Sequence, residues 1–102
     1  MVNRIFKSLD KSTARLNVPQ TLLEIVGITK NDKIAICTDN YSGGIKLKPL
    51  DMVNDEKIIG IVKLDNKGRF VFPDYLLEDE DKTNLKFEIF VHNSELIVIP
   101  VN

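Results

Sequence analysis

The chain contains one sequence pattern twice, and this repeat limits the folds that are open to it. The first copy reads DKSTARLNVP over residues 10–19, and the second reads DNKGRFVFP over residues 65–73. In each copy an Asp is followed by a short polar loop, an Arg, three mostly apolar residues and a Pro. The two arginines, Arg15 and Arg69, are 54 positions apart. A period of roughly 50 residues in a chain of 102 indicates two copies of one supersecondary unit.

Each copy predicts the element order ββαββ. In the first copy we expect a helix that begins at Pro19, a residue suited to a first helical turn, and ends before the terminator Gly27. In the second copy we expect a shorter helix from Pro73 to about Asp79. Alternating and β-branched segments predict the strands at residues 4–9, 16–18, 33–38, 45–50, 58–64, 69–72, 85–91 and 96–101.

The size of the chain predicts one domain, residues 1–102, in which the two copies share a core. Repeat one spans residues 4–50, repeat two spans residues 58–101, and a polar linker covers residues 51–57. Each half has about 50 residues and would be marginally stable alone. The hydrophobic fraction of 43% is ordinary for a globular protein.

We expect a cytoplasmic protein without a membrane-spanning segment. No apolar run approaches the roughly 20 residues that cross a bilayer, and the N-terminal sequence MVNRIFKSLDKS lacks an apolar signal core. The single cysteine, Cys37, cannot form an internal disulfide, which fits a reducing compartment. The formal net charge of −1 divides unevenly, since residues 1–51 carry +3 and residues 52–102 carry −4.

The repeated pattern resembles the AbrB-type family of bacterial transition-state regulators, which includes SpoVT-like and MraZ-like proteins. The second copy, GIVKLDNKGRFVFPDYLL, contains the Asp-x-x-Gly-Arg motif, an apolar triplet and a Pro before a short helix. The first copy, KSLDKSTARLNVPQTLLEIVGI, has one extra loop residue and Ala14 where the family usually has Gly. The resemblance covers the chain from about Arg4 to Val101.

The resemblance implies a mostly β fold with two short helices. In this family one ββαββ unit does not fold alone. Two units, usually from two chains, interleave their hairpins and form one swapped-hairpin β-barrel of a double-psi-like kind. A chain that carries both units is similar to the MraZ arrangement, so we expect a pseudo-dimeric monomer. Exchange of hairpins between chains would use the same contacts and give a homodimer.

The resemblance also implies a sequence-preferring regulator of transcription that binds double-stranded DNA. Phosphate contacts would supply most of the affinity, and arginines can also read guanine edges. The alternative is that the basic residues around the repeated loops are ordinary solvated charges. In that case Arg15 and Arg69 would form ion pairs with Asp10 and Asp65 that only hold the loops in shape. The candidate DNA-binding residues lie around the repeated loops: Arg4, Lys7, Lys11, Arg15, Lys63, Lys67 and Arg69.

Four consecutive acids, Glu78, Asp79, Glu80 and Asp81, follow the second predicted helix. Carboxylates at that end oppose the helix dipole and would repel phosphate on the same face. They are either a solvated helix end or an acidic docking patch for a basic protein partner. The second interpretation describes a non-enzymatic, antitoxin-like interaction module. For DNA binding, we expect the first copy to dominate.

Other residues that often carry chemistry form no catalytic or metal-binding pattern in this sequence. His92 has no cysteine or carboxylate at metal-ligand spacing, and Cys37 fits a core position better than a reactive one. The segment 42–44 lacks the Lys-Ser/Thr and the helix of a phosphate-binding loop. Asp10 and Asp65 are turn residues rather than a catalytic pair. We therefore expect no enzyme, no cofactor and no metal.

Overall fold

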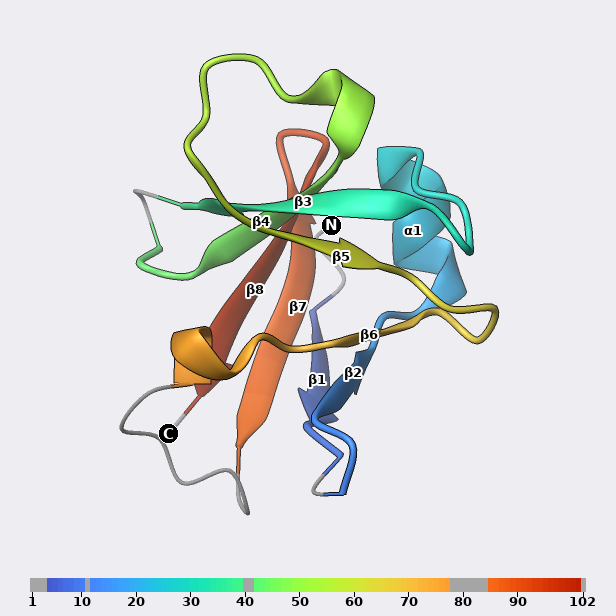
Figure 1. Ribbon diagram of the computed structural model, residues 1–102, viewed down its shortest axis with the longest axis vertical. Helices are drawn as coiled ribbons and strands as arrows, with labels where there is room; N and C mark the ends of the chain where they lie inside the picture. Colours follow the sequence, from blue (N-terminus) through green and yellow to red (C-terminus); the bar gives the residue numbers. More distant parts are fainter. Residues whose placement is uncertain (1–3, 11, 40–41, 78–84, 102) are drawn as a thin grey trace.

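The computed structural model describes residues 4–10, 12–39, 42–77 and 85–101 (Figure 1). This part of the chain is mostly β-structure with one α-helix and two 3₁₀ turns. The elements in chain order are β1 (Ile5–Ser8), β2 (Arg15–Asn17), α1 (Gln20–Val26), β3 (Lys33–Thr38), β4 (Ile45–Pro49), η1 (Leu50–Met52), β5 (Ile58–Lys63), β6 (Arg69–Val71), η2 (Asp74–Leu77), β7 (Lys86–His92) and β8 (Glu95–Val101).

Strands from both halves of the sequence build one antiparallel six-stranded sheet. Its order is β1-β7-β8-β4-β3-β5, so β1 of the first half pairs with β7 of the second half. In the same way, β5 of the second half pairs with β3 of the first half. The order stays the same when equivalent strands of the two halves are exchanged. Neither half therefore forms its part of the sheet alone.

The strands do not close into the expected barrel. Within the described residues, the edge strands β1 and β5 do not pair with each other, and β2 and β6 form a separate two-stranded ribbon. Each ribbon strand has only three residues, and its backbone pairs with the other ribbon strand, as at Leu16 and Phe70. The ribbon lies over one face of the sheet instead of extending it.

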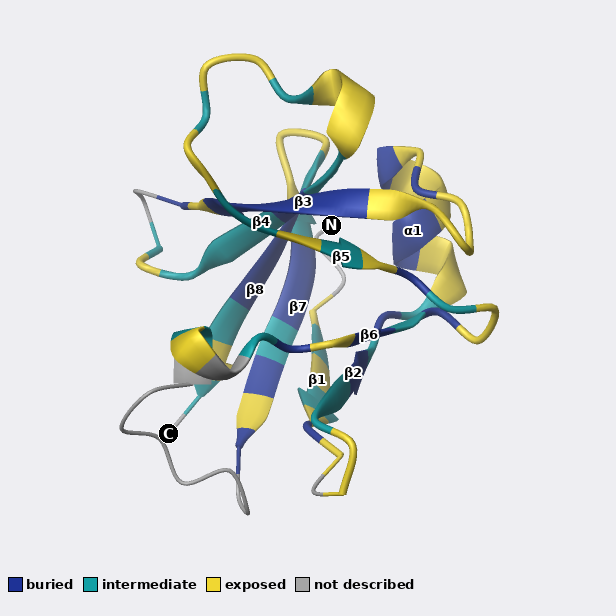
Figure 2. Ribbon diagram, in the orientation of Figure 1, coloured by how far each residue is buried: buried dark blue, intermediate teal, exposed yellow. Residues whose placement is uncertain are grey.

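The hydrophobic core lies between the six-stranded sheet, the ribbon and α1. Leu16 and Phe70 of the ribbon are 0% and 1% exposed, and they belong to the same cluster as Ile36, Leu47 and Val98 of the sheet. Figure 2 shows that the buried positions follow the middle of β3, β7 and β8. Each large apolar side chain that is fully buried stabilises the fold by roughly 1.5–3 kcal/mol. This shared core joins the two copies.

Helix α1 begins and ends where the sequence predicts. The carbonyl oxygen of Pro19 accepts hydrogen bonds from the first helical turn, and Gly27 ends the helix with a left-handed φ of 76°. The N–H of Ile28 then donates to the carbonyl of Leu23 at 2.9 Å, which satisfies a terminal carbonyl. The buried helix residues are Leu22, Leu23 and Val26.

The second predicted helix is a 3₁₀ turn, η2, over Asp74–Leu77. The expected end near Asp79 lies outside the described residues. The sequences of the two copies differ after this element. The first copy continues with Ile25, Val26 and the capping Gly27, whereas the second continues with four acids at 78–81. Those residues offer no apolar stripe to bury and no glycine cap.

The hairpin between β7 and β8 turns through two residues, Asn93 and Ser94. Both have positive φ angles, 52° and 63°, as the primed turns of tight hairpins require. Within the described part of the chain, no helix has the length and apolar character needed to span a membrane.

Candidate nucleic-acid interface

The β2–β6 ribbon presents both repeated arginines to solvent on one face. The register pairs Arg15 with Val71 and Asn17 with Arg69, while the intervening Leu16 and Phe70 point into the core. The two arginines are diagonal neighbours, so their Cα atoms are roughly 7–8 Å apart. We call this surface the ribbon face, and its residues are Arg15, Asn17, Arg69 and Val71.

The loop before Arg69 is organised by Asp65. One carboxylate oxygen of Asp65 accepts the backbone N–H groups of Lys67 and Arg69, each at 2.9 Å. The other oxygen accepts Nε–H of Arg69, also at 2.9 Å. These backbone and side-chain bonds lower the pKa of Asp65. Asp65 therefore fixes the direction of the Arg69 side chain, whose terminal nitrogens have no hydrogen-bond partner among the described residues.

The loop before Arg15 is organised differently. Oδ1 of Asp10 accepts the hydroxyl and the backbone N–H of Ser12, both at 2.9 Å, and the N–H of Thr13 at 3.3 Å. These bonds lower the pKa of Asp10. Arg15 forms no ion pair with a described residue. The ion pair between Asp and Arg that the sequence suggested for each loop is therefore present in the second copy. The described residues do not show it in the first copy.

The two loops are tied to opposite ends of the ribbon. The antiparallel pairing of β2 with β6 places the loops that precede them at opposite ends. The carbonyl of Ala14 accepts the N–H of Phe72 at 2.8 Å, and the carbonyl of Gly68 accepts the N–H of Val18 at 2.9 Å. The side-chain amide of Asn17 adds a bond to the carbonyl of Lys67 at 3.2 Å. These contacts set the register that brings the arginines together.

The predicted lysines lie at different distances from the ribbon face. Lys67 is exposed in the loop that contacts Asn17, and Lys63 is exposed at the end of β5, two residues before Asp65. Lys7 is half-buried on the core-facing side of β1, since its partner in register is the buried Phe87. Lys11 lies outside the described residues, as do Glu78, Asp79, Glu80 and Asp81.

Arg4 lies on the opposite side of the sheet from the ribbon. Its guanidinium forms an ion pair with Glu88 at 3.0 Å and sits 4.8 Å from the ring centre of Phe90. Glu88 and Phe90 alternate along β7 with the core residues Phe87 and Ile89, so they face away from the core. Arg4, which the sequence places among the candidate DNA-binding residues, therefore lies apart from the ribbon face. Its partners are far away in the sequence, and only the strand register brings them to it.

Asn17 and Val71 also belong to the ribbon face, although they are not among the candidate residues expected from the sequence. Val71 is 49% exposed and stands opposite Arg15, and Asn17 stands opposite Arg69. A signal for both was available, because side chains two positions apart on a strand share a face. In the segments RLN and RFV, the residue two after each Arg therefore lies beside it.

A group of ion pairs covers the other face of the sheet. Lys48 binds Glu56 at 2.7 Å and Glu95 at 3.3 Å, and Lys46 also binds Glu95 at 3.3 Å. Beneath them Cys37 is fully buried, and this burial raises the pKa of its thiol. The described residues contain no group of three or more His, Cys, Asp or Glu that could hold a metal ion.

Comparisons with protein-family models, with curated proteins and with solved structures found no match to this chain. The sequence repeat and the geometry of the ribbon face are therefore the basis for assigning a function.

Proposed function

We propose that this protein is a non-enzymatic regulator of transcription of the AbrB type, which binds double-stranded DNA through the ribbon face. The observation that carries the proposal is the position of Arg15 and Arg69. The two repeats place these residues on one solvent-facing side of a two-stranded ribbon, as diagonal neighbours. A duplicated sequence has thus produced a pair of cations at one place on the surface.

The cross-pairing of the two halves supports the swapped-hairpin fold that this function implies. The N–H of Leu9 donates to the carbonyl of Leu85 at 3.0 Å, and the N–H of Leu64 donates to that of Asp32 at 2.9 Å. These two bonds occupy equivalent places in the two copies, and each joins one copy to the other. Interleaved ββαββ units require contacts of this kind. We infer that the sheet and the ribbon together form an open variant of the AbrB-type architecture.

The shape and chemistry of the ribbon face suit the major groove of DNA. The major groove of B-DNA is about 12 Å wide and admits a two-stranded β-ribbon. Arginine binds O6 and N7 of guanine with two hydrogen bonds, and asparagine binds adenine in a similar way. Arg15, Arg69 and Asn17 supply these groups, and the exposed Val71 can contact the methyl group of thymine.

The cations around the ribbon face are few, so the proposed binding depends on local charge. Lys67 and Lys63 are placed to meet phosphates beside the groove, since phosphate contacts fix the register of a protein on DNA. The chain as a whole carries a formal charge of −1 and has its acidic excess in the second half. We therefore expect moderate affinity and a shallow dependence on salt.

The proposal is tested by adding a short DNA duplex of mixed sequence to isotope-labelled protein at low salt. We expect the NMR shift changes to concentrate in β2 and β6 and on the Nε–H signals of Arg15 and Arg69. The amides of β4 and the Lys46 to Glu95 region, on the other face, serve as an internal control. An unchanged spectrum at excess DNA would contradict the proposal and favour the protein-interaction module.

A further inference from the structure

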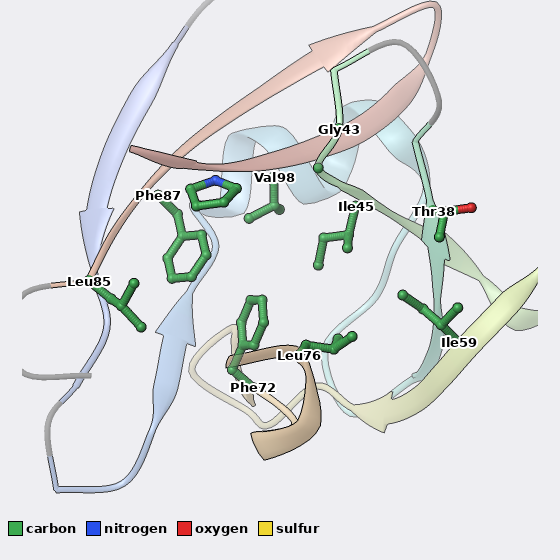
Figure 3. Close-up of a pocket in the computed structure, with 11 residues that line it drawn as sticks. Thr38, Gly43, Ile45, Ile59, Phe72, Leu76, Leu85, Phe87 and Val98 are labelled. Carbon is green, nitrogen blue, oxygen red and sulfur yellow. The ribbon is translucent and has the colours of Figure 1, made fainter. Parts of the chain in front are cut away.

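A cavity opens on the inner side of the sheet, next to η2. It has a volume of about 270 Å³ and lies between strands β4, β7 and β8 and the turn η2. Figure 3 shows that the side chains of Ile45, Phe72, Leu76, Phe87 and Val98 point toward one shared space. The rings of Phe72 and Phe87 are stacked, with centroids 4.9 Å apart, and form an aromatic wall.

The cavity lies beside the second copy's counterpart of α1, since Leu76 lines it and corresponds to Leu22 at the 54-residue spacing. In the first copy α1 continues beyond Leu22 and buries Val26, and Ile28 follows as a further buried residue. In the second copy the corresponding element is η2, described over Asp74–Leu77. At the same 54-residue spacing, Glu80 and Lys82 stand in the sequence where the first copy has Val26 and Ile28. The sequence of the second copy therefore has charged residues where that of the first has Val26 and Ile28.

The size and lining of the cavity define the class of molecule that fits it. An engineered apolar cavity of about 150 Å³ is large enough to bind benzene. This cavity is larger, so it accommodates a molecule with one aromatic ring and a small substituent, or two fused rings. The described residues that line it include no ionisable side chain, and the hydroxyl of Thr38 is their one polar side-chain group. A charged ligand would lose its hydration there without compensation.

We propose that this cavity is a binding site for a small, uncharged, mainly apolar ligand of one or two aromatic rings. The site is separate from the ribbon face, and the inference does not depend on DNA binding. The ligand would pack against the stacked rings of Phe72 and Phe87. Because such a ligand binds the folded state, it raises the unfolding temperature as its concentration rises.

The test uses toluene and indole as probes and records methyl NMR spectra of the intact protein. We expect saturable shifts of the Ile45, Leu76 and Val98 methyl signals. The methyl signals of Leu22 and Leu23, in the filled half of the core, should stay in place and act as an internal control. The unfolding temperature should rise in parallel with the shifts.

Two matched variants separate cavity binding from general adsorption. Ile45→Phe places a ring in the cavity and should abolish both the saturable shifts and the thermal stabilisation. Ile25→Phe makes the same change at a residue of α1 that is 58% exposed, and it should bind the probes as the wild type does. Leu76→Phe, at a half-buried position of the same cavity, replaces the first variant if that one does not fold.

The proposal is overturned if neither probe shifts the methyl signals of Ile45, Leu76 and Val98 at saturating concentration. It is also overturned if the folded cavity-filling variant binds the probes as tightly as the wild type. Equal shifts across both halves of the core would show non-specific partitioning and would reject the site as well.

Discussion

Ala14 and Gly68 hold the same left-handed backbone conformation at equivalent points of the two repeated loops, with φ angles of 56° and 79°. Each residue precedes a ribbon arginine, and each carbonyl accepts a hydrogen bond from the opposite copy. Phe72 donates to Ala14 at 2.8 Å and Val18 donates to Gly68 at 2.9 Å. The left-handed conformation of these two residues thus directs the chain from the loop into the ribbon strand. Their hydrogen bonds also fix the register of the ribbon. The two positions differ in the side chain, and this difference makes the geometry testable.

We predict that Ala14→Gly stabilises the protein by about 1 kcal/mol. A left-handed conformation costs a residue with a Cβ atom roughly 1–2 kcal/mol, and the greater flexibility of unfolded glycine offsets part of the gain. The measurement is the free energy of unfolding from urea titrations at neutral pH. A variant that is less stable than the wild type would show that Ala14 does not hold this conformation.

The reverse substitution, Gly68→Ala, should destabilise the protein by more than about 1 kcal/mol. The φ angle of 79° is unfavourable for alanine, and the new Cβ would stand 3.0 Å from the carbonyl oxygen of Val18. That oxygen belongs to the backbone, so it cannot move aside as freely as a side chain. Urea unfolding measures the effect, and an unchanged midpoint would contradict the description of this loop.

Asp65 should make the stability of the protein sensitive to acid. Hydrogen bonds from Arg69 and Lys67 lower its pKa in the folded state, so the folded protein takes up fewer protons than the unfolded chain as the pH falls. The stabilisation is therefore present above about pH 4 and is lost as the pH drops toward the lowered pKa.

The comparison of the wild type with Asp65→Asn measures this effect. The difference between their free energies of unfolding should be largest near pH 6 and should shrink between about pH 5 and pH 3. A difference that stays constant over that range would mean that the titration of Asp65 is not coupled to folding.

Cys37 should react slowly with thiol reagents as long as the protein is folded. Its side chain is 0% exposed, burial raises its pKa, and Lys46 pairs with it in register on β4. Reaction with a disulfide reagent therefore requires opening of the structure, and we expect a rate at least about a hundredfold below that in urea. Rapid labelling in native buffer would show that the covering ion pairs do not protect this face.

Local sequence patterns predicted the elements of this fold well. All eight strands agree with the structure to within one residue at each end, because alternation and turn residues act over short distances. The helix from Pro19 to Gly27 was also predicted, since its cap and buried stripe lie within it. The second helix, expected from Pro73 to about Asp79, is a 3₁₀ turn over Asp74–Leu77, and its expected end lies outside the described residues.

Features that depend on pairing between distant residues were less predictable. The separate ribbon, in place of a closed barrel, follows from which strands share hydrogen bonds across the two halves. Arg4 could be placed only when the register brought it to Glu88, a residue 84 positions away. For the ribbon face, the spacing of the two motifs indicated the arginines. The neighbours Asn17 and Val71 followed only from the strand geometry.

The most direct test of the account is a fluorescence titration of a labelled DNA duplex with two double variants. Arg15→Ala with Arg69→Ala removes both cations of the ribbon face. Arg4→Ala with Lys86→Ala removes the same charge from the other face of the sheet, so it is a matched control. Circular dichroism spectra establish that both variants are folded.

We predict that the wild type binds DNA with a log–log salt slope of about −3, for three or four phosphate contacts. The ribbon-face variant should lose at least about tenfold in affinity, because each arginine pair with a base contributes roughly 1–3 kcal/mol. The control should bind within about twofold of the wild type, because its missing charges lie far from the DNA. Absence of binding by the folded wild type, or an equal loss in both double variants, would contradict the account.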